Sequence, residues 1–235
     1  MLQQKSRNDR FGFTLAEVLI TLGIIGVVAA MTMPALINNS QNKELQAALN
    51  KGYSEISQAL DLMKYDVGED ILPVNYPART FAPIYRKYFK SLKTVDQSGI
   101  ITGTQDEGGS YNPNKSFENY KTYNKSQAVK TSFFDDGQIL LEDGTLILIE
   151  NPDLTPYRIY ITIDVNGPNK KPNIWGKDLF TFQITETGKL LPMGMDGTTY
   201  TDMDKYCSKN SNESINGIAC TAKALSDPDF FKKMY

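Results

Sequence analysis

The residues best suited to binding chemistry lie in one stretch of the C-terminal half. Asp164 and Asn166 precede a glycine, and Asp178 ends the same stretch. Carboxylate and amide oxygens near a glycine turn are suitable ligands for a hard cation, so Asp164, Asn166 and Asp178 are candidate calcium ligands. The stretch also contains three lysines and lacks an acidic residue at EF-hand spacing. An Asx-type turn held by Asp164 and Asn166 explains the same pattern and is the preferred interpretation.

The composition excludes several classes of enzyme. The chain has no histidine, which rules out Ser-His-Asp and Cys-His nucleophilic systems and imidazole metal sites. No P-loop, nucleophile motif or paired-acid constellation is evident, so we predict that the protein is not an enzyme. The net charge of -2 does not indicate nucleic-acid binding.

Two cysteines, Cys207 and Cys220, lie close together near the C-terminus. A zinc site normally needs more thiolates or imidazoles than these two residues supply. In an exported domain a disulfide is therefore the favoured interpretation, and two reduced, unrelated thiols are the alternative.

The N-terminal segment is apolar from Phe13 to Ile37, with Glu17 as its only charge. A helix of about 20 residues is about 30 Å long, enough to cross the hydrocarbon core of a bilayer. The preceding residues 1–12 carry a net positive charge, which predicts a cytoplasmic N-terminus and an exported remainder. The segment is too long for a cleaved signal peptide, which has a shorter apolar core. A plain signal anchor gives no reason for Glu17, because a carboxylate at membrane depth costs about 2.5–3.5 kcal/mol.

The residues Gly12-Phe13-Thr14-Leu15-Ala16-Glu17 resemble the prepilin cleavage and methylation motif of the type IV pilin and pseudopilin family. The resemblance implies that prepilin peptidase cuts between Gly12 and Phe13 and that Phe13 becomes N-methylated. Glu17 then takes the place of the family's characteristic glutamate, which pairs with the free amine of an adjacent subunit. Pro34 falls where many pilins have a helix-kinking proline.

The same resemblance implies a structural subunit of a type IV pilus or a type II secretion pseudopilus. The expected partners are prepilin peptidase, other copies of itself or related subunits, the inner-membrane assembly platform and membrane lipid. The chain would cross the bacterial inner membrane once before it enters a filament in the periplasm or at the cell surface. The family also has C-terminal disulfide loops and, in some pseudopilins, bound calcium, and no other cofactor is expected. The alternative is a membrane-tethered extracytoplasmic binding domain that does not polymerise.

The elements that position these residues begin with one long helix, predicted from about Thr14 to Tyr65. Its second half is amphipathic, since apolar residues recur every three or four positions at Leu45, Leu49, Tyr53, Ile56, Leu60 and Met63. Gly52 is a mild flaw in that helix. The predicted divisions are a leader at 1–12, a membrane and polymerisation helix at 13–37 and its amphipathic continuation at 38–65.

The rest of the chain is predicted to form a connector at 66–132 and a β-sheet head at 133–235. The connector would hold a short helix over 81–92 and a polar stretch whose Tyr111, Tyr120 and Tyr123 lie on the surface. Hairpin patterns over 138–149 and 179–192, with a strand near 157–165, predict an antiparallel sheet of about four strands. The predicted fold is therefore α+β, with the long helix packed on the sheet, as in the type IV pilin fold.

Overall fold

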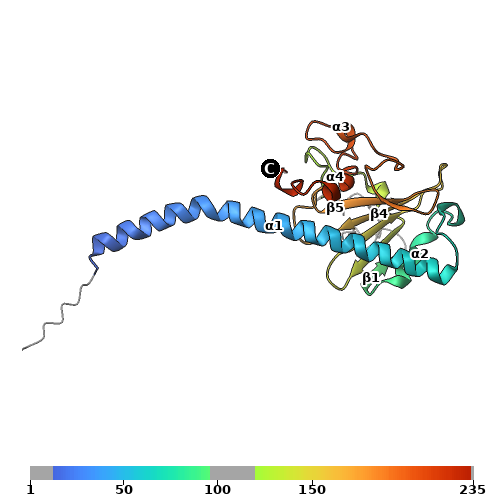
Figure 1. Ribbon diagram of the computed structural model, residues 1–235, viewed down its shortest axis with the longest axis horizontal. Coiled ribbons are helices and arrows are strands. Elements are labelled where there is room, and N and C mark those ends of the chain that lie inside the picture. Colours follow the sequence, from blue (N-terminus) through green and yellow to red (C-terminus); the bar gives the residue numbers. More distant parts are fainter. Residues whose placement is uncertain (1–12, 96–119, 234–235) are drawn as a thin grey trace, which may run out of the picture. The chain divides into compact units, whose positions relative to one another are not determined.

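The computed structural model of the protein describes residues 13–95 and 120–233 (Figure 1). Gly12, the rest of the predicted leader and Tyr111 lie outside these residues. The chain divides into two compact units, Met1–Gln41 and Asn42–Tyr235. Each unit is described by itself below.

The predicted long helix is confirmed as α1, which spans Leu15–Val67 and contains Pro34 in its interior. In the second unit its buried positions follow the predicted apolar stripe and are Asn42, Leu45, Leu49, Gly52, Ile56, Ala59, Leu60 and Met63. Gly52 is a packing feature, because a Cβ added there would lie 2.7 Å from Cδ1 of Ile163. The kink expected at Pro34 stays a prediction.

Six strands from the described residues form one antiparallel sheet in the order β1-β2-β3-β4-β5-β6 (Figure 1). Their bounds are Ser91–Val95, Gly137–Leu141, Leu146–Glu150, Ile159–Asp164, Leu179–Ile184 and Leu190–Pro192. The α+β fold class is thus confirmed, but the sheet has more than the four strands expected. The extra edge strand β1 lies in the predicted connector and pairs with β2, about 45 residues further along the chain.

Several short helices accompany the sheet. They are η1 Pro73–Asn75, α2 Phe81–Tyr85, η2 Arg86–Tyr88, η3 Thr131–Phe133, α3 Met203–Tyr206, α4 Cys220–Ser226 and η4 Phe231–Lys233. The helix expected over 81–92 is therefore too long, because the chain turns into β1 at Ser91. The short α2 is held to α1 by the Tyr85 hydroxyl, which donates to the carbonyl of Ile56 at 2.6 Å.

One face of the sheet is aliphatic and aromatic and packs on the second half of α1. Residues alternate along a strand, so Ile161 and Ile163 of β4 share this face with their β5 partners Phe182 and Phe180. All four are fully buried. The Tyr53 ring of α1 stacks on Phe182 with the ring centroids 5.0 Å apart. Burial of this continuous surface provides the main hydrophobic stabilisation of the head.

The opposite face of the sheet is also covered, and it contains buried polar groups. Thr162 and Thr181 face each other across β4 and β5 with their hydroxyls 2.8 Å apart. The fully buried Trp175 donates its indole N–H to the Thr181 hydroxyl at 2.9 Å, and Thr181 N–H donates to the Thr221 hydroxyl of α4. These bonds satisfy polar groups that would otherwise be costly to bury, and they attach the C-terminal segment to the sheet.

The end of the predicted connector also packs into this second layer. Tyr120 is buried, and Tyr123 is half-buried and packs near Phe230. The prediction that these tyrosines are surface aromatics is therefore wrong for Tyr120 and only partly right for Tyr123. The physical reason is that residues 120–128 pair with the 173–175 segment, through Lys121 N–H to the Asn173 carbonyl and Trp175 N–H to the Lys121 carbonyl.

Candidate functional site

The beginning of α1 is a capping box built from Thr14 and Glu17. The Thr14 backbone N–H and hydroxyl each donate to Oε2 of Glu17 at 2.8 Å, and Glu17 N–H donates to the Thr14 hydroxyl at 3.2 Å. This reciprocal arrangement satisfies N–H groups that a helix start leaves without partners. In the single chain Glu17 is thus hydrogen-bonded to its own helix. Phe13 precedes the box with its side chain 88% exposed.

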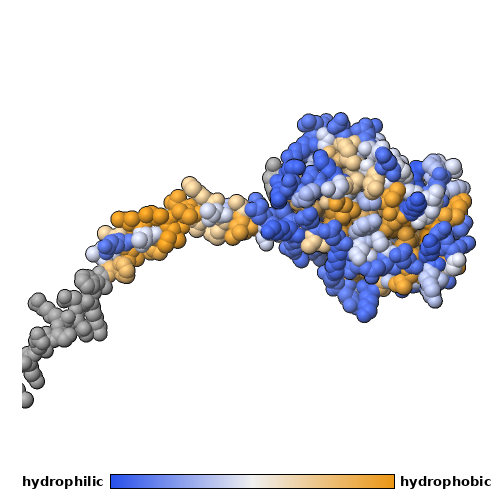
Figure 2. Space-filling model, viewed as in Figure 1, coloured by the Kyte–Doolittle hydropathy of each residue, from blue (hydrophilic) through white to orange (hydrophobic). Residues whose placement is uncertain are grey.

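The apolar part of α1 in the first unit presents its side chains outward. Among the described residues, α1 is the one helix long and apolar enough to cross a membrane, and none of that apolar window is buried. Leu15, Met31 and Leu36 are each at least 70% exposed. Figure 2 shows apolar side chains over most of the visible surface of this segment. An apolar surface of this extent indicates a segment that is covered by lipid or by other proteins.

The candidate ligands of the 164–178 stretch form hydrogen-bonded turns. Oδ1 of Asp164 accepts from the backbone N–H groups of Gly167 at 2.9 Å and Asn166 at 3.3 Å, which is the Asx-type turn expected from the sequence. The other oxygen of Asp164 accepts from the Tyr120 hydroxyl. Asp178 accepts from the N–H groups of Asn173 and Ile174, both at 2.6 Å.

Both carboxyl groups of this stretch are fully buried. Burial and the nearby charge of Asp178 raise the pKa of Asp164 to about 8, against the opposing effect of its hydrogen bonds. Burial likewise raises the pKa of Asp178 to about 6. The two groups titrate as a pair, which holds about one proton at neutral pH.

The donor set of this stretch is compatible with a hard cation. The side-chain oxygens of Asn166 and Asn173 are buried and accept no hydrogen bond in the described part of the chain. Together with the two carboxylates they are the oxygen types that calcium prefers. All four carboxylate oxygens, however, already accept hydrogen bonds, three from backbone N–H groups of the turns and one from the Tyr120 hydroxyl. Calcium binding by Asp164, Asn166 and Asp178 therefore stays a prediction.

Cys207 and Cys220 form the expected disulfide, with their Cα atoms 5.0 Å apart. The enclosed loop is also fixed by hydrogen bonds. The buried Asn216 side chain accepts from Ser208 N–H and donates to the carbonyls of Ser208 and Ser211. From outside the loop, the side chains of Asn124 and Gln127 donate to the carbonyls of Ser211 and Asn212, both at 2.7 Å.

Sequence reasoning missed an acidic cluster at one end of the sheet. Carboxylate oxygens of Asp135, Asp136 and Glu150 lie within 4.8 Å of one another. Asp136 accepts from Nε of Arg79 at 2.9 Å and from Asn151 N–H at 2.8 Å. Burial and then the charge of Asp136 raise the pKa of Glu150 to about 9. Asp135 and Asp136 lie in the loop before β2 and Glu150 ends β3, so no local motif marked the cluster.

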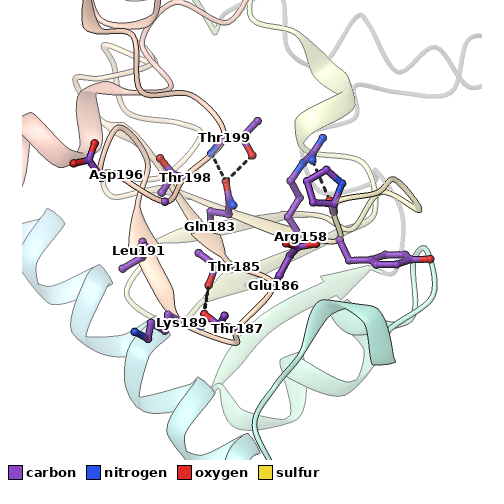
Figure 3. Close-up of a pocket in the computed structure, with 13 residues that line it drawn as sticks. Arg158, Gln183, Thr185, Glu186, Thr187, Lys189, Leu191, Asp196, Thr198 and Thr199 are labelled. Carbon is purple, nitrogen blue, oxygen red and sulfur yellow. Dashed lines mark hydrogen bonds between the residues drawn. The ribbon is translucent and has the colours of Figure 1, made fainter.

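A groove in the head was also missed. It has a volume of about 690 Å³ and is bordered by residues 156–158, the β5–β6 turn and the loop at 196–199 (Figure 3). Its lining is rich in threonine and includes charged side chains of both signs. These residues span 44 positions of the sequence, and the pairing of β4 with β5 and of β5 with β6 brings them together.

The comparisons with known proteins each cover only part of the chain. The family described as "Prokaryotic N-terminal methylation motif" matches residues 7–33. The chain is 28% identical to the type IV major pilin protein PilE1 of Neisseria gonorrhoeae over 113 residues, which is 47% of this chain and 49% of that protein. It is 36% identical over 93 residues to the type II secretion system core protein G of Aeromonas hydrophila, covering 36% of this chain and 61% of the relative.

The core protein G of Escherichia coli K12 is 32% identical over 62 residues, which is 26% of this chain and 42% of that protein. The chain thus spans about half the length of the curated relatives it matches. No solved structure is significantly similar to it. The motif and the partial sequence similarity both point to type IV pilins and type II secretion pseudopilins, and the long helix with its antiparallel sheet is pilin-like.

Proposed function

We propose that this chain belongs to the type IV pilin and pseudopilin family and is a filament subunit, processed by prepilin peptidase and assembled through the first part of α1. The observation that carries the proposal is the position of Glu17. Glu17 lies inside an exposed apolar helix segment and within the motif at which the family is cleaved and methylated. Neither a signal peptide nor a plain anchor accounts for an acid at this position.

The apolar segment of α1 exposes its side chains. A segment without buried side chains is unfavourable in water, and it gains free energy in a bilayer or against other apolar helices. Both environments supply that gain, so one segment can serve as a membrane anchor and later as a filament core. The head does not need the segment for its own core, since the buried hydrophobic residues begin at Leu45.

Glu17 makes the contact between neighbouring subunits specific. Cleavage between Gly12 and Phe13 creates an amine on Phe13, four residues before the capping-box carboxylate of Glu17. In the proposed filament the amine of one subunit pairs with Glu17 of its neighbour. Charge-assisted hydrogen bonds are stronger than neutral ones, and in a low-dielectric helix bundle a paired charge fixes the axial register of the subunits.

Both kinds of relative are filament-forming by the family resemblance, and the matches do not separate a pilus from a secretion pseudopilus. We propose that the chain is a subunit of either a pilus or a secretion pseudopilus, and that it assembles in the same way in both. Filaments that can be sheared from the cell surface support a pilus, and polymers that stay in the periplasm support a pseudopilus.

The test uses the full-length chain in its native host. In-cell cross-linking of wild type is expected to give a ladder of multimers, and intact-mass analysis is expected to show loss of residues 1–12 and a methyl group on Phe13. Glu17→Ala should remove the ladder while the protein stays in the membrane. Glu44→Ala, an exposed acid of the same helix in the second unit, is the matched control.

Two outcomes contradict the proposal. A native chain that keeps its leader in cells with active prepilin peptidase shows that the motif is not used. A Glu17→Ala chain that still forms the wild-type ladder shows that Glu17 does not direct assembly. A processed chain that never cross-links supports the alternative, a membrane-tethered binding domain.

A further inference from the structure

We propose that the groove between residues 156–158, the β5–β6 turn and the 196–199 loop binds a neutral carbohydrate (Figure 3). The groove lies wholly in the second unit, and the proposal does not depend on filament assembly. Its volume of about 690 Å³ is in the range of pockets that hold small organic ligands. The polar groups that line the groove indicate which kind of ligand it binds.

Gln183 supplies a fixed hydrogen-bond donor in the groove. The residue is only 5% exposed, and its Oε1 accepts from both the N–H and the hydroxyl of Thr199 at 2.8 Å. This pair of bonds fixes the orientation of the amide, so the NH₂ end is the free end. Within residues 13–95 and 120–233 that NH₂ group has no hydrogen-bond partner. A nearly buried donor of this kind calls for an acceptor from water or a ligand.

The charged lining residues indicate which ligands fit. Arg158 and Lys189 are cationic, Glu186 and Asp196 are anionic, and none of the four forms an ion pair with another described residue. In this groove a simple anion would be repelled by two carboxylates, and a simple cation would be repelled by two basic groups. An apolar ligand leaves the Gln183 donor unsatisfied. A neutral ligand with many hydroxyls can accept from the amide and donate to the carboxylates at the same time.

The groove is already shaped by internal hydrogen bonds. The hydroxyls of Thr185 and Thr187 lie 3.1 Å apart at the β5–β6 turn, and Thr185 also accepts from Lys189 N–H at 3.3 Å. On the opposite wall the Thr198 hydroxyl donates to the Met195 carbonyl at 2.7 Å. A preformed arrangement reduces the ordering cost of binding.

An extended peptide is the main competing ligand, since its backbone also donates and accepts. Peptides of this kind commonly bind by adding a strand to a sheet edge. The edge next to the groove is β6, which has only three residues and ends in Pro192, a residue without a backbone N–H. The edge therefore offers little for strand addition, and the side chains of the groove favour a saccharide.

The experiment measures binding to the processed full-length chain by saturation-transfer NMR and calorimetry. The probes are maltotriose, cellotriose and triacetylchitotriose, and the detergent is a polyoxyethylene ether because alkyl glycosides would occupy a sugar site. At least one trisaccharide is expected to bind. Gln183→Glu keeps an oxygen for Thr199 but replaces the donor, and it should weaken binding about tenfold or more, as expected for loss of a bond to a buried donor.

Glu186→Ala lies on the exposed turn and is a second variant that leaves the core untouched. It should also weaken binding, whereas Glu69→Ala, an exposed acid outside the lining, should not. The proposal is overturned if none of the three trisaccharides binds, if both groove variants bind as wild type does, or if a random octapeptide pool occupies the groove and the sugars do not. Filament ladders of Gln183→Glu should match wild type, which separates this test from that of the proposed function.

Discussion

The buried pair Asp164 and Asp178 predicts that the head loses stability as the pH rises from 6 to 8. Burial raises both pKa values, to about 8 and about 6, whereas an unfolded aspartate has a pKa of about 3.9. Over this pH range the folded pair therefore binds more protons than the unfolded chain. Since stability rises with pH only where the unfolded state binds more protons, here it must fall.

The size of the effect follows from the number of protons. Between pH 6 and 8 the folded pair holds about one proton that the unfolded chain does not. One proton corresponds to about 1.4 kcal/mol per pH unit, so the unfolding free energy should fall by about 3 kcal/mol over the two units. This is a large share of the stability of an ordinary domain. Glu150, whose pKa is raised to about 9, adds a slope of the same sign.

The perturbation that isolates the pair is Asp164→Asn. It removes the proton-binding group that titrates between pH 6 and 8 and leaves Glu150 in place. Urea unfolding of the full-length chain in detergent, followed by fluorescence of the sole tryptophan, Trp175, gives the free energy at pH 6, 7 and 8. Trp175 is fully buried in the head and reports its unfolding. Wild type should lose about 2 kcal/mol more than the variant over this range, because the variant keeps the smaller contribution of Asp178.

The matched control is Asp153→Asn, which changes an exposed carboxyl on the same domain and should keep the wild-type slope. If wild type is equally stable at pH 6 and pH 8, the pair does not hold a proton in the folded state. If Asp164→Asn keeps the full wild-type slope, the proton belongs to another group, and Glu150→Gln then identifies it.

Three further predictions concern packing, the disulfide and calcium. Gly52→Leu should destabilise the head by about 1–3 kcal/mol in urea because its side chain meets Ile163, whereas an unchanged midpoint would show that the helix can move away. The Cys207→Ser, Cys220→Ser double variant should lose about 3 kcal/mol, and equal stability of oxidised and reduced wild type would contradict this. Millimolar calcium should raise the urea midpoint of wild type but not of Asp178→Asn, and no effect on wild type would leave the 164–178 stretch a purely structural turn.

Sequence periodicity predicted the parts of the fold that depend on local pattern. The stripe through Leu45, Leu49 and Ile56 marked the buried face of α1, because an amphipathic helix repeats every 3.6 residues. Two cysteines in a domain expected to be exported were enough to predict their pairing. Gly52 was recognised as unusual, but its reason, close approach to Ile163, needed the sheet in place.

The features that sequence did not predict depend on contacts between distant residues. Tyr120 and Asp164 are 44 residues apart, and a tyrosine in a polar stretch gives no sign that it will be buried against an acid. Gln183 occupies a strand position that looks like an ordinary solvent-facing polar residue, yet it is fixed by Thr199. The register of the β-strands creates such pairs, and strand pairing is set by tertiary context.

The capping box changes the energetic account of the proposed assembly. The sequence suggests an acid without a partner, and relief of that unpaired charge would then drive polymerisation. The structure instead gives Glu17 two donors from Thr14 in the single chain. Assembly through Glu17 would therefore exchange one set of hydrogen bonds for another, with a net gain limited to the difference between a charged and a neutral partner, about 1–2 kcal/mol.

The larger driving force must then come from packing between the apolar helices. Side chains such as Phe13 and Leu15, at 88% and 78% exposed, have most of their surface available for burial. Lipid already covers this surface before assembly, so the gain comes from close van der Waals packing of helix against helix and not from removal of water. Apolar contact is non-directional, whereas the acid and amine meet in one register only. Replacing Glu17 should therefore remove the register on which the cross-linked ladder depends, although the apolar segments keep their affinity for lipid and for one another.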